Sequence, residues 1–127
     1  MGLYEGDPLG RIGMLSDQTA RAARLVIDTG LHTRGWSRQQ AVDYLRANSA
    51  WSDVDVQYEI DRYISMPAQA TSYMLGSLEI RRLRDQAIAT QGDAFDIRQF
   101  HDQVLQYGTI TLPMLDAAVV DWLAAAR

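Results

Sequence analysis

Residues 73–92, YMLGSLEIRRLRDQAIATQG, contain the clearest structural pattern in the chain. Small and apolar residues recur there at spacings of three and four, while Glu79, Arg82 and Gln86 occupy other faces. This periodicity matches one face of an α-helix. Gly92 is a typical residue to end such a helix. We therefore predict an amphipathic helix whose inner stripe consists of Tyr73, Gly76, Ile80, Leu83 and Ala87.

Similar signals divide the rest of the chain into five more helices. Asp7 and Pro8 are typical of the start of the first helix, and Gly30 is its expected end. Ser37 and Gln40 have the spacing of a capping box, which predicts the start of the second helix. The remaining predicted N-caps are Ser52, Asp96 and Thr111.

The inner faces of these helices follow from the same periodicity. No stretch alternates with a period of two, so we expect no strands. Short connections favour antiparallel neighbours, and the predicted fold is an all-α, irregular antiparallel bundle of about six helices in one domain, residues 1–127. The predicted inner residues are Ile12, Leu15, Thr19, Ala22 and Val26; Ala41, Tyr44 and Leu45; Val56, Ile60 and Tyr63; Ile97, Phe100, Val104 and Leu105; and Leu115, Val119, Trp122 and Ala126.

The composition excludes several classes of function. The 127 residues carry a net charge of −4, which argues against non-specific nucleic-acid binding because that needs a basic surface. The absence of cysteine excludes disulfides and thiolate chemistry. No apolar run has the length of a membrane span. Residues 1–10 lack the features of a signal peptide, so we expect a cytoplasmic protein if the chain is a complete gene product; otherwise its location stays open.

The histidines do not form a recognisable metal motif. His32 and His101 are far apart in the sequence, and neither belongs to an HExxH pair. A zinc site needs several ligands that converge on one point, so we expect no metal site within this chain. The sequence also lacks a P-loop, a GxGxxG motif and a GxSxG nucleophile elbow.

Three polar residues with a spacing of four form the first candidate constellation. Arg24, Asp28 and His32 would lie on one stripe if the first helix continued past Gly30. They could form a substrate-facing edge, in which Arg24 pairs with a carboxylate and His32 donates a hydrogen bond. They could equally form an ordinary i,i+4 ion pair followed by a histidine at the helix end. The spacing by itself favours the second interpretation.

Tyr73 and Gln69 form the second candidate, one helical turn apart. A tyrosine on an apolar stripe is usually a core residue whose hydroxyl finds a hydrogen-bond partner. The pair could instead line a cleft. The sequence leaves both interpretations open.

Two longer stretches carry a resemblance to a known family. They are residues 21–32 (RAARLVIDTGLH), followed by GWS at 35–37, and residues 67–73 (PAQATSY). In these stretches, and over about residues 3–122 as a whole, the chain resembles the bacterial family called "domain of unknown function 885". Further matching positions are Gln40, Ala41, Glu59, Arg62, Tyr63, Gly76, Phe95, Asp96, Phe100, His101, Val104 and Leu105.

This resemblance implies a part of a larger enzyme. Proteins of the family are longer, mostly helical and similar to zinc metallopeptidases of the gluzincin kind. Their ligands, an HExxH-type helix and a later glutamate, lie upstream of the region that this chain matches. The chain would then be the C-terminal portion of a metallopeptidase-like hydrolase. It would be inactive alone, because zinc is implied only for the intact protein.

The resemblance also implies roles for five residues within a substrate cleft. His32 and Tyr73 would donate hydrogen bonds to the oxyanion of a tetrahedral intermediate. Arg24, Arg62 and Gln69 would contact the peptide substrate, with the arginines orienting a carboxylate.

A second hypothesis is a non-enzymatic helical module for protein–protein interaction or self-association. Separation from a larger protein would leave an apolar face exposed. The expected partner is therefore the remainder of the parent protein or further copies in a homo-oligomer, either of which would cover that face.

Overall fold

The computed structural model describes residues 2–125, and these residues form α-helices and short 3-10 helices. The predicted all-α class with about six helices is confirmed. Ala126, predicted at the end of the last stripe, lies outside the described residues. The elements are α1 (Pro8–Thr33), α2 (Arg38–Ala47), α3 (Asp53–Ser65), η1 (Gln69–Thr71), α4 (Ser72–Gln91), η2 (Gly92–Ala94), α5 (Ile97–Leu105) and α6 (Leu112–Ala125).

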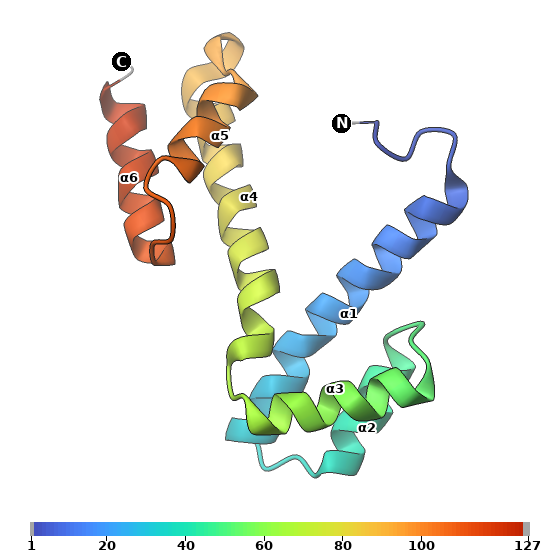
Figure 1. The fold of residues 1–127 in the computed structure, drawn as a ribbon. Helices are drawn as coiled ribbons and strands as arrows, with labels where there is room; N and C mark the ends of the chain where they lie inside the picture. The colour runs from blue at the N-terminus through green and yellow to red at the C-terminus, as the bar shows by residue number, and fades with distance from the viewer. Residues whose placement is uncertain (1, 126–127) are drawn as a thin grey trace. The chain divides into compact units, whose positions relative to one another are not determined.

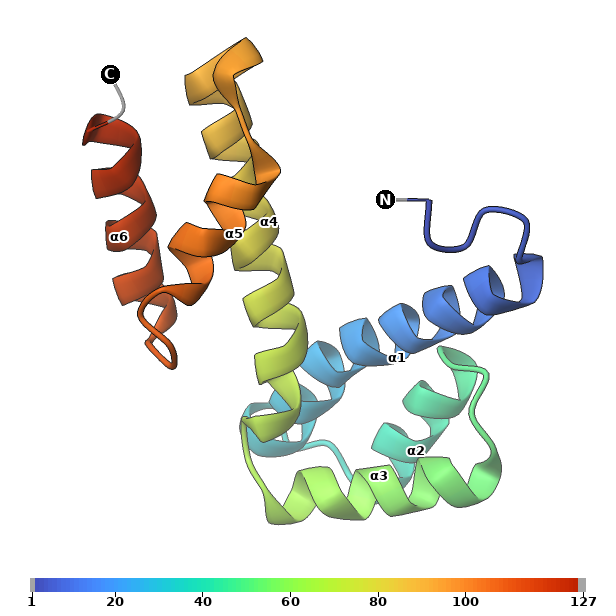
Figure 2. The same cartoon turned by 45° about the horizontal axis from the view of Figure 1, so that its top comes forward.

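The chain divides into two compact units, Met1–Met74 and Leu75–Arg127, and the boundary falls in the first turn of α4. In the first unit, α2 and α3 pack against the C-terminal half of α1 (Figures 1 and 2). Burial of apolar side chains between these helices is the main stabilising contribution to this unit. Its buried core contains Ala23, Ile27, Ala41, Val42, Leu45, Val56, Ile60, Tyr63 and Ala70.

Local signals in the sequence fix the start of α2 and α3, as predicted. Ser37 and Gln40 form the expected capping box, in which the Gln40 side chain accepts from the Ser37 backbone N–H at 2.8 Å. Ser52 caps α3 by accepting from the backbone N–H of Asp55 at 3.2 Å. These caps satisfy N–H groups that have no partner within the helix.

The predicted end of α1 at Gly30 is wrong, because the helix continues to Thr33. Gly30 is buried, and a Cβ atom at this position would overlap the indole ring of Trp36. Close packing therefore explains the glycine, and the positive φ of 68° needed after the helix is supplied by Gly35. The longer helix places Arg24, Asp28 and His32 on one stripe.

The second unit packs α5 and α6 beside the C-terminal part of α4 (Figure 1). Asp96 caps α5 as predicted, and Gly92 follows α4 with a φ of 53°. The predicted inner stripe of α1 is wrong as a whole, because Ile12, Leu15, Thr19, Ala22 and Val26 are all exposed and the apolar buried face is formed by Ala20, Ala23 and Ile27 instead. Three further predicted inner positions are also wrong: Tyr73 and Ile80 are partly exposed on α4, and Leu105 is largely exposed on α5. The core of the unit is formed by Leu83, Ala87, Phe100, Leu115, Val119 and Leu123.

None of the helices within residues 2–125 is both long enough and apolar enough to cross a lipid bilayer.

Two glycines of α1 should respond to alanine in opposite directions. Nothing lies within 4 Å of a Cβ atom built at Gly13, so Gly13→Ala should stabilise the protein by about 0.5–1 kcal/mol through higher helix propensity. Gly30→Ala should destabilise it by about 1–3 kcal/mol, because the half-buried Trp36 ring would have to move. Urea unfolding monitored by circular dichroism measures both changes. Equal effects of the two substitutions would contradict the packing role of Gly30.

Candidate functional site

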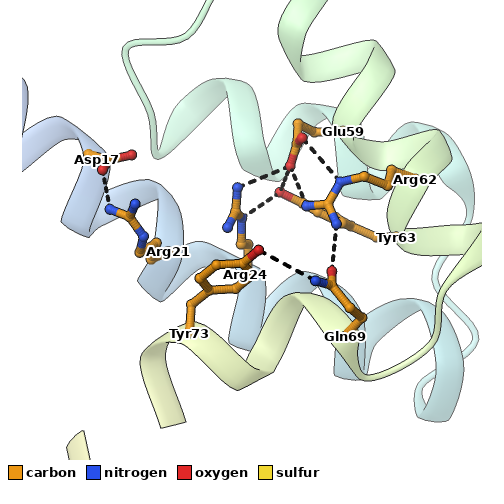
Figure 3. Close-up of polar contacts among 8 residues, drawn as sticks. All are labelled: Asp17, Arg21, Arg24, Glu59, Arg62, Tyr63, Gln69 and Tyr73. Atoms are coloured by element: carbon orange, nitrogen blue, oxygen red, sulfur yellow. Dashed lines mark hydrogen bonds and ion pairs between the residues drawn. The ribbon is translucent and has the colours of Figure 1, made fainter. Parts of the chain in front are cut away.

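The candidate site is a network of polar side chains centred on the Glu59 carboxylate, on the side of α3 that faces α1 (Figure 3). Glu59 Oε2 accepts from the Arg24 guanidinium of α1 at 3.1 Å and from Arg62 at 2.9 Å. The Tyr63 hydroxyl donates to the same oxygen at 2.5 Å. One carboxylate therefore pairs with two guanidinium groups and one phenol.

Spacing along α3 explains how this network forms. Glu59, Arg62 and Tyr63 are separated by three and four residues, so they share one face of the helix. Tyr63 is fully buried, and its hydroxyl accepts from Arg24 Nε at 2.8 Å while it donates to Glu59. The phenol thus meets both of its hydrogen-bonding requirements inside the core.

Aromatic rings surround the guanidinium group of Arg24, a residue that is only 9 % exposed. Its Cζ atom lies 5.0 Å from the ring centroid of Tyr73, 5.4 Å from Trp51 and 5.7 Å from Tyr63. These distances permit cation–π attraction, which compensates part of the cost of removing the charge from water.

A chain of side chains leads from this buried network to the surface. Arg62 donates to Gln69 Oε1 at 2.5 Å, and Gln69 Nε2 in turn donates to the Tyr73 hydroxyl at 3.4 Å (Figure 3). The Arg62 side chain is 22 % exposed, and Tyr73 is 46 % exposed. The Tyr73 hydroxyl is therefore held at the accessible end of a connected set of donors.

Asp28 fixes the turn that carries Gln69. Both of its carboxylate oxygens accept from the backbone N–H of Ala68 at 3.1 Å, and Asp28 is almost fully buried. Ala68 has a φ of 68°, a strained conformation for a residue other than glycine. The contact anchors this turn to α1 and so determines where Gln69 and Tyr73 lie.

His32 takes a separate position at the end of the same α1 stripe. Its Nε2 lies 3.1 Å from the backbone oxygen of Tyr63, near the end of α3. Among the described residues, no hydrogen bond connects it to Tyr73. Each of the three stripe residues thus makes its hydrogen bonds to other elements: Arg24 to Glu59 and Tyr63, Asp28 to Ala68, and His32 to Tyr63. The predicted i,i+4 ion pair between Arg24 and Asp28 is wrong, because these two residues have other partners.

The electrostatics of the network favour an ionised Glu59. Burial opposes ionisation, but hydrogen bonds from Arg62 and Tyr63 and the charges of Arg62 and Arg24 outweigh it and lower the pKa of Glu59. Burial and the hydrogen bond to Glu59 raise the pKa of Tyr63, which keeps this phenol protonated. The hydrogen bond to Glu59 raises the pKa of Arg62. The linked groups Arg24, Glu59 and Arg62 therefore carry one surplus positive charge.

Four of the five predicted site residues meet in this network, namely Arg24, Arg62, Gln69 and Tyr73. Sequence reasoning missed Glu59 and Tyr63 as the residues that join them. Their spacing with Arg62 on α3 was a usable signal, whereas their pairing with Arg24 depends on how α1 and α3 pack.

The network also borders an open surface cavity. Its lining residues are Arg24, Trp51, Asp55, Tyr58 and Glu59, and its volume is about 350 Å³. A cavity of this size is at the lower end of those that hold small ligands.

The described residues do not fit a zinc site. Across residues 2–125, no group of three or more histidine, aspartate or glutamate side chains converges closely enough to hold a metal ion. Zinc requires at least three protein ligands in a catalytic site.

Comparison with known proteins identifies the family. Residues 1–119 match the family described as "Bacterial protein of unknown function (DUF885)". The chain belongs to this DUF885 family. No curated protein matches it.

A solved structure shows the same fold in a much longer protein. The crystal structure of "the putative lipoprotein from Colwellia psychrerythraea" is 45 % identical in sequence and superimposes with a TM-score of 0.95 over 98 % of this chain. The match covers 21 % of the Colwellia protein, so this chain spans about a fifth of that protein's length.

Removal of the Glu59 charge tests the central role of this residue in the DUF885 segment. Glu59→Gln should destabilise the first unit by about 2–3 kcal/mol near neutral pH, somewhat less than for a fully buried pair, because two guanidiniums lose their counter-charge. Urea unfolding can be followed by the fluorescence of Trp36 and Trp51 in a Trp122→Phe background. Asp61→Asn is the matched control. Asp61 lies on α3, like Glu59, but its ion pair with Arg38 of α2 is exposed, so this substitution should have little effect on stability.

The difference in the free energy of unfolding between the wild type and Glu59→Gln should depend on pH. The folded-state pKa of Glu59 is below its ordinary value of 4.5, so its stabilising effect is complete above that pH and is lost as the pH falls through the folded-state pKa. The stability difference between the wild type and Glu59→Gln should therefore shrink from about pH 6 to about pH 3. A constant difference over this range would contradict an ionised Glu59 at the centre of the network.

Proposed function

We propose that this chain forms one wall of the substrate cleft in a larger, metallopeptidase-like hydrolase of the DUF885 family. Both units would belong to one segment of that protein, and zinc would be bound by residues outside this segment. The segment would be inactive by itself. Its contribution would be to orient a peptide substrate and to stabilise negative charge that develops during hydrolysis.

The observation that carries this proposal is the surplus positive charge beside a half-exposed phenol. Arg24 and Arg62 share the single carboxylate of Glu59, and Arg62 is linked through Gln69 to Tyr73. A site of this kind favours an anion, because positive charge and preorganised donors lower the energy of negative charge in a partly desolvated place.

The residues would have different roles in this cleft. Tyr73 is the best-placed donor, because its accessible hydroxyl can turn toward an oxyanion while Gln69 holds it in position. His32 would be a second donor through an imidazole N–H. Arg62 would orient a substrate carboxylate through the N–H groups that do not contact Glu59 or Gln69. Arg24 is more enclosed and would act through the field of its charge.

Substitutions of the two proposed donors test this function in a full-length family protein that carries this segment. Tyr73→Phe and His32→Ala should each lower kcat/KM by roughly tenfold or more, the scale of losing one transition-state donor. Cleavage of a defined peptide library, read by mass spectrometry, gives the rates. Tyr107→Phe is the control, since Tyr107 is an exposed tyrosine outside the candidate site, and it should keep full activity. Full activity in both donor variants would refute the assignment.

Zinc content gives an independent test of where the metal is bound. The 127-residue chain should purify without stoichiometric zinc, whereas the full-length protein should contain it, because the ligands would come from outside this segment. Metal analysis by mass spectrometry measures both proteins. One zinc ion per isolated chain would contradict the proposal.

The alternative function is a non-enzymatic helical module for interaction or self-association. The exposed apolar residues of α1 and α4 support it, because large apolar surfaces often mark interaction sites. A full-length protein that cleaves no peptide would favour this alternative.

A further inference from the structure

The N-terminal half of α1 exposes an apolar surface that the first unit does not use. The buried residues of this helix begin at Ala20 and continue to Gly30. The N-terminal end of the helix extends past α2 and α3 in both views (Figures 1 and 2). Leu9, Ile12 and Leu15 are 79 %, 63 % and 48 % exposed.

This surface continues into a groove. Ile12 and Leu15 line one side, and Ala47 at the end of α2 and Ala50 in the α2–α3 connection line the other. The volume is about 450 Å³. None of the eight described residues that line the groove is charged, and four of them, Ser16, Thr19, Asn48 and Ser49, are polar. A charged side chain buried here would lose its hydration without a counter-charge, so the groove suits an uncharged segment whose apolar side chains contact Ile12 and Leu15.

Helix propensity gives a further reason to expect a covering partner. Gly13 lies in this half of α1, and glycine within a helix is unfavourable compared with alanine. Gly10 has a local explanation, because a Cβ atom there would overlap the Asp7 carboxylate that caps the helix. A solvated helix end with an interior glycine gains little from its own sequence. Packing of an apolar face against a partner is the usual source of stability for such a helix.

We propose that Leu9, Ile12, Leu15 and the adjoining groove, together called the α1 docking surface, bind an apolar segment from the remainder of a full-length family protein. The length of the solved relative favours this occupant, because the region that matches this chain covers only 21 % of the Colwellia protein. The proposal does not depend on hydrolytic activity.

Thiol labelling tests the α1 docking surface directly, because the chain contains no cysteine. One variant carries Ile12→Cys, and a matched control carries Arg11→Cys at the neighbouring exposed position. The equivalent two positions are substituted in the full-length Colwellia protein. Maleimide labelling rates are then measured at each introduced thiol by peptide mass spectrometry.

Docking predicts that the thiol of the Ile12→Cys variant reacts roughly tenfold or more slowly in the full-length protein than in the isolated chain. In the full-length protein the docked segment would cover this thiol, and maleimide could reach it only after local opening. The thiol of the Arg11→Cys control should react at similar rates in both proteins. Equal rates for the Ile12→Cys variant in both proteins would overturn the proposal.

Self-association is the competing outcome, and the same variants detect it. If a second copy covers the surface, the thiol of Ile12→Cys in the isolated chain becomes protected as the protein concentration rises, and light scattering shows a dimer. That result would show that a second copy of the chain, and not the remainder of the family protein, occupies the α1 docking surface, and it would overturn the proposal. The proposal is supported if the isolated chain has a monomeric mass and its labelling rate does not depend on concentration, while the thiol is protected only in the full-length protein.

Discussion

The sharing of one carboxylate by two guanidinium groups is the interaction on which the candidate site depends. Glu59 connects Arg24 of α1 with Arg62 of its own helix, and Tyr63 hydrogen-bonds to both Glu59 and Arg24. Burial raises the free energy of each isolated charge, so the arrangement is stable only while all members are present. This mutual dependence holds α1 and α3 in one relative position and gives the site its rigidity.

The rigid network determines what the accessible residues can do. Asp28 anchors the turn at Ala68, and Arg62 holds the Gln69 that follows. Two contacts thus position the Tyr73 hydroxyl: Asp28 fixes the backbone of the preceding turn, and Arg62 fixes the Gln69 side chain that hydrogen-bonds to Tyr73. Preorganised donors of this kind contribute more to charge stabilisation than mobile ones, because they need no reorganisation when charge develops.

The first unit carries two kinds of surface. One is polar, around Arg62 and Tyr73, and the other is uncharged and exposes Leu9, Ile12 and Leu15 along the first half of α1. This chain matches about a fifth of the longer Colwellia protein, and the two proposals assign both surfaces to contacts with other parts of such a protein. A catalytic cleft and a docking contact are physically separate properties, so either can be present without the other.

The sequence by itself determined the helices and most of their starts, because caps such as Ser37 and Ser52 act over three or four residues. It also indicated most of the inner residues of α2 to α6 through their periodicity, but it chose the wrong face of α1. Only the tertiary structure decided that α1 continues through Gly30, since the reason is the Trp36 ring packed on it. Likewise, Arg24 pairs with Glu59, 35 residues away, instead of with Asp28. Local signals cannot specify such contacts, because their energy depends on how two distant helices pack.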